Sequence, residues 1–503
     1  MIRGVGAPLR RWRQRSRLQP PRLQRELPTL SIVIPVYNAA DHVADCLKSV
    51  LKQEYRNIDV VIIDDGSKDD SLAIVRRYAA ADGRITLLTQ PNAGASAARN
   101  AAIDRATGEF LTFVDADDTV TGNGLAEAMR TLVSTGSDIA VMPYQRLNGH
   151  TFGKPAKWIR DLHASPRPRT TLEESPDVMV NAIACAKIFR RDFWDRVGLR
   201  FLPGVIYEDQ ILTAEAYREA EAIDILATPA YNWRVQESSV SQGQVTVDNV
   251  LARLNAAEQS LALLDSLPAV RSERALQLLR YNMANSVLKL ERADDDYLDI
   301  LIEHLPAVVD AAPVDACAAI VPAQLRVVYE LIRNGDRDRI WAYVRAEGMQ
   351  VEMHPSGQET VGFVAYLPGW GRDPVPAQAY VLTQEQTAFQ ARILRAHRLG
   401  AREFALDVQA WFQNVDIGSA LEVVVRADGV VLDSDVRRNG IDAVVGSRQG
   451  AERRYRGSGW TVTVGYVSRS LPKFLDVELS LTAGPFAGAR TFAKFPSSRI
   501  EAL

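Results

Sequence analysis

The chain has little of what marks a disulfide-stabilised or zinc-binding protein. Its 503 residues include only three cysteines, Cys46, Cys185 and Cys317, and six histidines. The cysteines lie far apart and none forms a CxxC pair, so neither a disulfide framework nor a zinc cluster is encoded. This cysteine usage favours a reducing, cytoplasmic compartment.

Long apolar runs are missing as well. No window reaches the ~18 consecutive apolar residues of a membrane span, and residues 1–28 lack the apolar segment of a secretory signal. These residues carry eight arginines and one acid, Glu26, whereas the whole chain has a net charge of −3. We expect this tail to be either a disordered, solvated leader or a peripheral contact with anionic lipid at the inner face of the plasma membrane. The acidic remainder argues against a nucleic-acid-binding surface.

The rest of the composition is ordinary. With 47% hydrophobic and 24% charged residues, the chain is typical of folded globular proteins, and its length allows about three domains. Changes in charge and in the spacing of apolar residues along the sequence predict a basic, disordered tail (1–28), an α/β domain (29–246), a helical linker domain (247–349) and a β-rich accessory domain (350–503).

Strands and helices alternate from residue 30. Short β-branched runs at 31–37, 58–64, 85–88 and 110–114 are separated by stretches with helical spacing of apolar residues. This order predicts a mostly parallel sheet covered by helices on both faces. Beyond residue 351 the apolar residues alternate with period two, and Ala427-Asp-Gly429 predicts a hairpin turn. We expect one or two β-sandwich-like modules there.

Polar clusters follow three of the predicted strands: Tyr37 and Asn38, Asp64 and Asp65, and Asp115-Ala-Asp117-Asp118. Each cluster alone is also typical of an ordinary turn or helix cap. Ligands of parallel sheets bind at the carboxyl ends of the strands, however, where all three clusters would share one rim. Asp115 and Asp117 lie on the same side of the chain, and one or two carboxylates with substrate phosphates are typical of Mg²⁺ or Mn²⁺ sites.

Four blocks in this region carry a resemblance. They are Ser31-Ile-Val-Ile-Pro-Val-Tyr-Asn38, Val61-Ile-Ile-Asp-Asp-Gly-Ser67, Asn92-Ala-Gly-Ala-Ser-Ala-Ala-Arg-Asn100 and Val114-Asp-Ala-Asp-Asp118. In this order and at this spacing they resemble the nucleotide-sugar half of an inverting family-two glycosyltransferase with a GT-A fold.

The resemblance implies transfer of a sugar from a nucleotide-sugar donor, most often UDP-linked in this family. The acceptor would be a hydroxyl of a cell-surface polysaccharide, a teichoic acid or a lipid-linked glycan precursor. Asp117 would bind Mn²⁺ or Mg²⁺. The donor nucleotide would lie against Pro35, Tyr37, Asn38, Asp65, Asn92, Arg99 and Asp115.

The acceptor half should supply one base, because an inverting transfer is a single displacement. Glu208-Asp209 resembles the family's Glu-Asp motif, which implies Asp209 as the base and Glu208 as a hydrogen-bonding neighbour. Arg234 and Ser239 resemble the segment that closes the catalytic domain, with Arg234 reaching the diphosphate. Lys187 would either face phosphate or acceptor, or be a solvated surface lysine.

The domain order resembles that of bacterial wall teichoic acid glycosyltransferases, whose C-terminal modules would mediate homo-oligomerisation or polymer binding. The Gln-x-x-Arg-Trp signature of processive synthases is missing. A glycan-binding scaffold with a vestigial transferase domain stays open as an alternative. A sugar nucleotidyltransferase fits less well, because Pro35-Val-Tyr-Asn38 stands where those enzymes usually carry a Gly-rich loop. No GxGxxG follows the first strand, which argues against a NAD-linked dehydrogenase.

Overall fold

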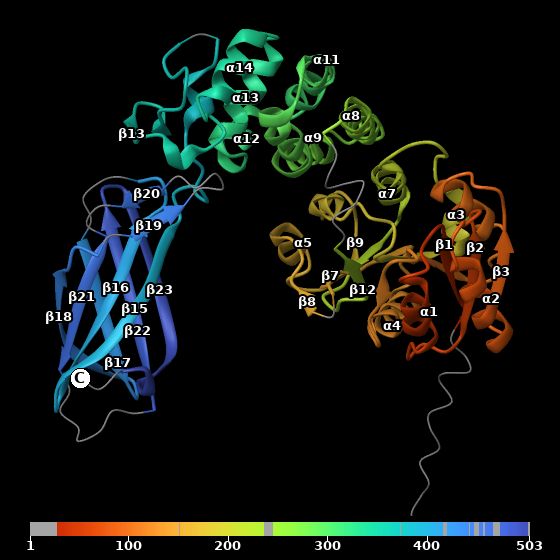
Figure 1. Cartoon of the computed structure of the whole chain (residues 1–503), viewed down its shortest axis with the longest axis horizontal. Helices are drawn as coiled ribbons and strands as arrows, with labels where there is room; N and C mark the ends of the chain where they lie inside the picture. Colours follow the sequence, from red (N-terminus) through yellow and green to blue (C-terminus); the bar gives the residue numbers. More distant parts are fainter. Residues whose placement is uncertain are drawn as a thin grey trace, which may run out of the picture. The chain divides into compact units, whose positions relative to one another are not determined.

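The computed structural model describes residues 28–149, 151–235, 245–372, 374–415, 420–441, 443–446, 452–455, 458–465 and 473–500. The chain divides into two compact units, Met1–Gly243 and Gln244–Leu503 (Figure 1). Ser239 and nearly all of the basic tail lie outside the described residues.

An eight-stranded sheet forms the centre of the first unit, in the order β3-β2-β1-β4-β10-β6-β11-β9. The strands are β1 (Leu30–Val36), β2 (Ile58–Asp64), β3 (Ile85–Thr89), β4 (Phe110–Phe113), β6 (Ile139–Val141), β9 (Arg167–Thr170), β10 (Lys187–Arg190) and β11 (Ile223–Ile225). β1 pairs in parallel with β2 and β4, whereas β10 is antiparallel to β4 and β6. Ile32, Val33 and Ile34 of β1 are fully buried, as expected for a strand covered on both faces. The predicted α/β class is confirmed.

The first unit also contains six helices of seven or more residues among its described residues (Figure 1). They are α1 (Val43–Leu51), α2 (Ser71–Ala81), α3 (Ala95–Ile103), α4 (Gly124–Thr135), α6 (Arg191–Val197) and α7 (Glu208–Glu219). In α1 the buried residues Val43, Leu47 and Val50 recur every three or four positions, which places them on one face of the helix. α4 ends at Gly136, whose φ of 74° is the left-handed conformation that favours glycine.

A small second sheet lies beside the first and has the order β5-β12-β7-β8. Its strands are β5 (Thr119–Val120), β7 (Tyr144–Asn148), β8 (Thr151–Gly153) and β12 (Tyr231–Arg234). β12 pairs with β5, which directly follows the acidic cluster, and with β7 on its other side. This pairing brings the end of the unit's described chain back to the acidic cluster. The short helix α5 (Lys157–Leu162) follows β8.

The second unit begins with helices, as predicted. They are α8 (Val247–Ala262), α9 (Pro268–Gln277), α10 (Met283–Val287), α11 (Asp295–Asp310), α12 (Val314–Ile320), α13 (Ala323–Arg333) and α14 (Arg337–Arg345). Thr246, Asp294 and Asp336 each accept a hydrogen bond from the backbone N–H three residues on, which fixes the starts of α8, α11 and α14.

The predicted β-rich module is confirmed in the same unit. A hairpin of β13 (Ser356–Glu359) and β14 (Gly362–Ala365) precedes a seven-stranded antiparallel sheet of order β15-β16-β21-β18-β17-β22-β23. Its strands are β15 (Phe389–Gly400), β16 (Glu403–Phe412), β17 (Ala420–Ala427), β18 (Val430–Arg438), β21 (Gly459–Gly465), β22 (Phe474–Ala483) and β23 (Phe486–Pro496), and β19 (Ala443–Gly446) and β20 (Glu452–Tyr455) form a separate hairpin. Asp428 and Gly429 have φ of 50° and 82°, the positive values of a two-residue hairpin turn, so the predicted turn is confirmed. The outer strands approach each other, and Arg490 Nη1 donates to the Ala391 carbonyl at 2.8 Å.

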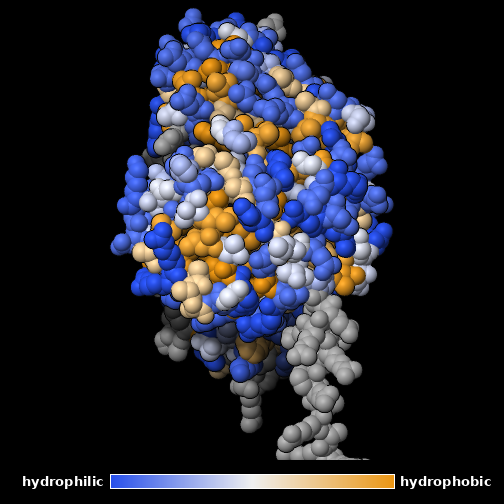
Figure 2. Space-filling model, turned by 90° about the vertical axis from the view of Figure 1, so that its right-hand side faces the viewer, coloured by the Kyte–Doolittle hydropathy of each residue, from blue (hydrophilic) through white to orange (hydrophobic). Residues whose placement is uncertain are grey.

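In the part of the chain that is described, no helix combines the length and apolar character needed to cross a bilayer. On the face drawn in Figure 2, apolar patches alternate with hydrophilic side chains. Such a mixed surface is usual, because roughly 55–60% of the accessible area of folded proteins comes from apolar atoms.

Candidate active site

The carboxyl ends of three parallel strands meet at one edge of the main sheet. β1 and β2 stay in register as far as Val36 and Asp64, and β1 and β4 as far as Val33 and Phe113. The predicted nucleotide-binding and metal-binding residues at or after these strand ends therefore lie along one rim: Pro35, Tyr37, Asn38, Asp65, Asp115 and Asp117. Tyr37 is 45% exposed, so an aromatic face is available there for a flat ligand to stack on.

Asp65 is buried and ties the end of β2 to the loop between β3 and α3. Its Oδ1 accepts hydrogen bonds from Gln90 Nε2 at 2.7 Å and Ala93 N at 2.9 Å, and its Oδ2 accepts one from Gly94 N at 2.9 Å. The carboxylate thus fixes the loop that presents the exposed Asn92. A contact between Asp65 and a nucleobase stays a prediction.

The loop after β2 also approaches its neighbours closely. Asn38, in the left-handed conformation with φ of 47°, accepts a hydrogen bond from Lys68 N at 2.8 Å through its side chain. A Cβ at Gly66 would lie 2.9 Å from the backbone nitrogen of Asn92, and φ there is 74°. Only glycine fits both conditions without strain. These contacts hold the rim's loops together.

A buried arginine joins the rim after β4 to the first turn of α7. Arg99, on α3, donates through Nη2 to Asp115 Oδ1 at 2.7 Å and through Nη1 to Glu208 Oε1 at 2.8 Å. Its guanidinium also lies 5.0 Å from the ring centroid of Phe201. The sequence predicts that Arg99 lies near the nucleotide, and in the structure its guanidinium binds two carboxylates. It holds the acid after β4 and the first acid of α7 at a common site.

The electrostatics of Glu208 reflect this position. Burial, followed by the neighbouring charge of Asp209, raises the pKa of Glu208 to about 7 against the opposing effect of the positive charge of Arg99. The hydrogen bond from Arg99 to Glu208 is charge-assisted, and the same guanidinium bridges Glu208 and Asp115 with one bond to each. The side chain of Glu208 is therefore held by its ion pair with Arg99.

The three acids after β4 have different environments. Asp117 is half-buried, and its pKa is raised by burial and by the charge of Asp115. Asp118 is almost fully buried and accepts hydrogen bonds from Tyr231 Oη and Arg234 N, both at 2.6 Å. Burial, followed by the charges of Asp115 and Asp117, raises the pKa of Asp118 to about 8. Asp118 thus anchors β12, whereas Asp115 is paired with Arg99.

Arg234 lies at this acidic cluster, and its contact with a diphosphate stays a prediction. Its Nε donates to the backbone carbonyl of Asp117 at 2.7 Å, and its charge lowers the pKa of Asp117. The anchoring roles of Asp118 and Tyr231 were missed by the sequence analysis, although the third acid of the motif was a visible signal. Ser239 lies outside the described residues.

Asp209 stands in the first turn of α7, next to Glu208. The helix follows Tyr207, which has a left-handed φ of 66°. Asp209 Oδ2 accepts a hydrogen bond from Ala184 N at 3.1 Å. Among the described residues this is the hydrogen bond that orients the carboxylate, and the N-terminal end of the helix favours its negative charge.

Lys187 is placed differently from both sequence expectations. It is fully buried, so a solvated surface lysine is wrong. Its Nζ donates to the Asn181 carbonyl at 2.9 Å, to Asn181 Oδ1 at 3.2 Å and to the Ile183 carbonyl. These acceptors use the three donors of an ammonium group, which leaves none for a phosphate. Lys187 instead supports the loop that carries Ala184, the partner of Asp209.

The titration of Lys187 gives a testable prediction. Burial lowers its pKa from 10.5 to about 7, so between these values the unfolded chain binds a proton that the folded chain does not. Folding stability contributed by Lys187 therefore rises with pH in this window, by about 1.4 kcal/mol per pH unit at most. The stability lost in Lys187→Met should grow from pH 7 to pH 10. Urea unfolding of both proteins at each pH measures this, and exposed Lys157→Met is the control. A loss independent of pH would contradict the prediction.

An α/β sheet whose parallel strands end at an acidic cluster, with a second acid pair joined to it by a buried arginine, defines a GT-A-type transferase domain. Residues 31–197 match the sequence model of glycosyl transferase family 2.

Several curated glycosyltransferases are similar in sequence. The chain is 26% identical to the poly(ribitol-phosphate) beta-glucosyltransferase of Bacillus spizizenii, over 63% of this chain and 50% of that protein. It is 27% identical to the poly(ribitol-phosphate) beta-N-acetylglucosaminyltransferase TarS of Staphylococcus aureus, over 61% of this chain and 54% of that protein. Glycosyltransferase GlyA of Streptococcus pneumoniae is 29% identical over 42% of this chain, and the match spans 31% of its length. The chain thus covers less than two thirds of each of these relatives.

Solved structures of S. aureus TarS share the fold. One of them aligns with 92% of this chain and 77% of its own, with a TM-score of 0.58 and 18% identity. A shorter form of TarS, residues 1–349 in complex with UDP-GlcNAc, aligns with 69% of this chain, with a TM-score of 0.56 and 21% identity.

Proposed function

We propose that this protein is an inverting glycosyltransferase that moves a sugar from a UDP-linked donor to a hydroxyl of a polyol-phosphate or related cell-surface polymer. The observation that carries the proposal is the Arg99 bridge, which brings Asp115 of the donor rim and Glu208 of α7 to one site. The printed activities of the TarS-like relatives and the UDP-GlcNAc complex of TarS support the choice of donor and acceptor.

In the proposed reaction Asp209 removes the proton of the acceptor hydroxyl. The oxygen forms a bond to the anomeric carbon as the bond from that carbon to the nucleoside diphosphate breaks, and the diphosphate leaves with the electron pair. Attack from the opposite face inverts the anomeric centre. Because Arg99 holds Glu208, Asp209 is the acid of the pair assigned to the proton.

The residues at the rim fit a divalent cation. Asp117 is a hard oxygen ligand with a raised pKa in a cluster of three acids, so a cation would relieve its repulsion from Asp115. In the described residues no three His, Cys, Asp or Glu side chains converge as a metal cage, and Mg²⁺ and Mn²⁺ typically complete their shells with substrate phosphates and water. Mn²⁺ or Mg²⁺, when bound, would neutralise charge on the departing diphosphate. Asp117 would hold it.

Asp117→Asn tests this assignment. The variant should lose the metal-dependent part of donor binding, with affinity for UDP-GlcNAc falling at least about tenfold in Mn²⁺, because a carboxylate ligand is lost. Calorimetric titration with Mn²⁺ or with EDTA measures the effect. Asp45→Asn removes an exposed carboxylate of α1 and is the matched control. If Asp117→Asn bound the donor as wild type does, in a metal-dependent manner, Asp117 would not be the ligand.

A homo-oligomer formed by the β-rich module and a membrane contact of the basic tail stay predictions. Analytical ultracentrifugation of the full chain measures the first.

A further inference from the structure

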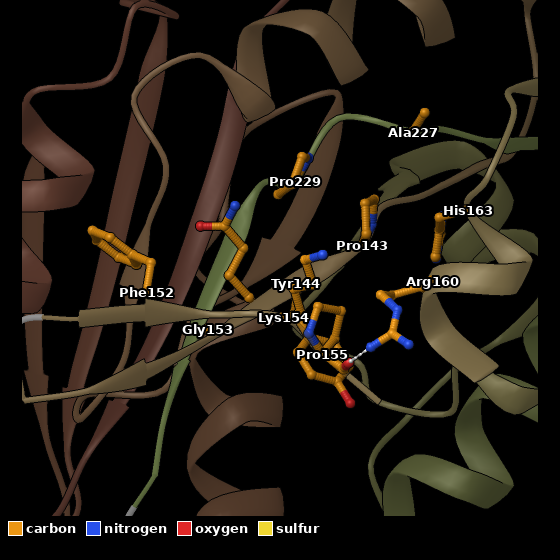
Figure 3. A pocket seen from close by; sticks show the side chains of 11 residues that line it. Pro143, Tyr144, Phe152, Gly153, Lys154, Pro155, Arg160, His163, Ala227 and Pro229 are labelled. Atoms are coloured by element: carbon orange, nitrogen blue, oxygen red, sulfur yellow. Dashed lines mark hydrogen bonds between the residues drawn. The ribbon is translucent and has the colours of Figure 1, made fainter. Parts of the chain in front are cut away.

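A cavity of about 310 Å³ lies in the first unit between the β7–β8 hairpin, α5 and the segment that leads into β12 (Figure 3). The side chains that give it chemical character are Tyr144, Gln145, Phe152, Lys154, Arg160 and His163, and it is called the hairpin pocket below. No residue of this pocket belongs to the rim described above. The proposed transfer reaction leaves it unused.

The hairpin pocket carries positive charge without a compensating acid. Lys154 and Arg160 are exposed, and none of the described residues that line the cavity is acidic. Arg160 Nη1 donates to the Pro155 carbonyl at 3.0 Å, as Figure 3 shows, which orients the guanidinium and leaves its other donors for a ligand. In the described structure Lys154 Nζ makes no hydrogen bond or ion pair. His163 is neutral at physiological pH because burial lowers its pKa to about 4.

Uncharged polar and aromatic groups complete the lining. Phe152 is 60% exposed on β8, and Tyr144 packs edge-on against Trp233 with ring centroids 5.9 Å apart. Gln145 adds an amide that can donate and accept hydrogen bonds. The two cations can bind an anionic group, and the aromatic surface and the amide can contact a hydroxylated chain. A polyol joined by phosphodiesters has both of these features.

The hairpin pocket shares its supports with the rim. Tyr144 pairs with Tyr231 across β7 and β12, and Tyr231 Oη donates to Asp118. On the other wall, His163 Nε2 lies 3.1 Å from Asn181 Nδ2, and Asn181 begins the loop that Lys187 holds. The same strand pair and the same loop therefore support both sites.

We propose that the hairpin pocket is a second acceptor subsite, which binds a phosphodiester of a polyol-phosphate polymer at least one repeat away from the hydroxyl that receives the sugar. This inference rests on the proposed function for its reaction. The second subsite leads to a prediction about acceptor length that does not follow from the reaction alone. Long anionic acceptors should be preferred to a single repeat unit.

The test uses the full chain and the double variant Lys154→Gln/Arg160→Gln. Ribitol-phosphate oligomers of eight repeats and the single repeat are used as acceptors at low ionic strength. For the octamer, KM should rise about tenfold while kcat and the KM for UDP-GlcNAc stay unchanged, and the KM for the single repeat should not move. Lys157→Gln is the control, because Lys157 lies on α5 with Arg160 but does not line the pocket and pairs with Asp161. This variant should behave as wild type.

Binding provides a readout that does not depend on transfer. Fluorescence anisotropy of a labelled ribitol-phosphate octamer should show about tenfold weaker binding to the double variant than to wild type. The association constant of wild type for the octamer should fall as the salt concentration rises. A neutral glucan octamer should bind both proteins equally. If wild type binds the octamer through these residues yet transfers no sugar, the subsite stands and the proposed function fails. Equal octamer binding by wild type and double variant, or an equal loss with the single repeat, overturns the subsite.

Discussion

Asp209→Asn is expected to lower kcat by about 10²–10⁴-fold, the usual contribution of a positioned general base. Asparagine keeps the size of the side chain, and its carbonyl oxygen can still accept the hydrogen bond that Ala184 N gives to Asp209 Oδ2 at 3.1 Å. The amide cannot take a proton from the acceptor. Donor affinity should therefore stay within about twofold, because the loss affects the chemical step. Initial rates with saturating UDP-GlcNAc, together with direct donor titration, separate the two quantities.

Two neighbouring variants make this test specific. Glu215→Gln changes a carboxylate on the same helix, away from its first turn, and should retain activity. Glu208→Gln should weaken the bridge to Arg99 and lower activity less than Asp209→Asn does, because its acid is already bound to the guanidinium. If Glu208→Gln abolished turnover while Asp209→Asn retained it, the base would be Glu208. Retention of full activity by Asp209→Asn would show that Asp209 is not the base.

Local patterns were sufficient to predict the elements that form the rim. β1, β2 and β4 are short runs rich in β-branched or aromatic residues, and the acids that follow β2 and β4 can be read directly from the sequence. The turn at Asp428 and Gly429 was equally visible, because the backbone requirement and the residue types coincide. In each case the determinant lies within a few residues of the feature.

The partners of buried charges could not be predicted in this way. Arg99 lies 16 residues from Asp115 and 109 from Glu208, so their ion pairs exist only after the sheet and α7 have assembled. Lys187 gave no sign of burial, since its acceptors are mostly backbone carbonyls, which have no side-chain signature. The hairpin pocket likewise needs segments more than sixty residues apart, such as Arg160 and Pro229. Tertiary assembly decides these features.

Arg99→Met is expected to destabilise the first unit strongly. It removes the guanidinium but keeps much of the side-chain volume, which leaves Glu208 and Asp115 without their shared cation. Breaking a buried ion pair in this way costs about 3–5 kcal/mol. Most of the cost should arise at Glu208, because the side chain of Asp115 is 37% exposed and water screens its charge. Urea unfolding of the full chain measures the difference from wild type.

The pH dependence distinguishes a charge effect from a packing defect. Arg99 lowers the pKa of Glu208, which burial raises to about 7, so without the arginine this pKa should rise further. A carboxyl with a raised folded-state pKa favours folding most below its unfolded value near 4.3, and this advantage is lost as pH rises through the folded-state pKa. Arg99→Met should therefore be closer to wild type at pH 5.5 than at pH 8.

Two further variants bound the interpretation. Arg99→Lys keeps the charge but, as a point charge without a planar fork, should recover only part of the stability. Arg200→Met breaks the exposed pair with Asp104 and should cost about 0–1 kcal/mol at either pH. A loss in Arg99→Met that is equal at both pH values would indicate lost packing against Phe201 instead of an uncompensated acid. The contact of Arg99 with Asp115 and Glu208 would then stabilise the fold mainly through packing. Another group would have to hold Glu208 next to the rim.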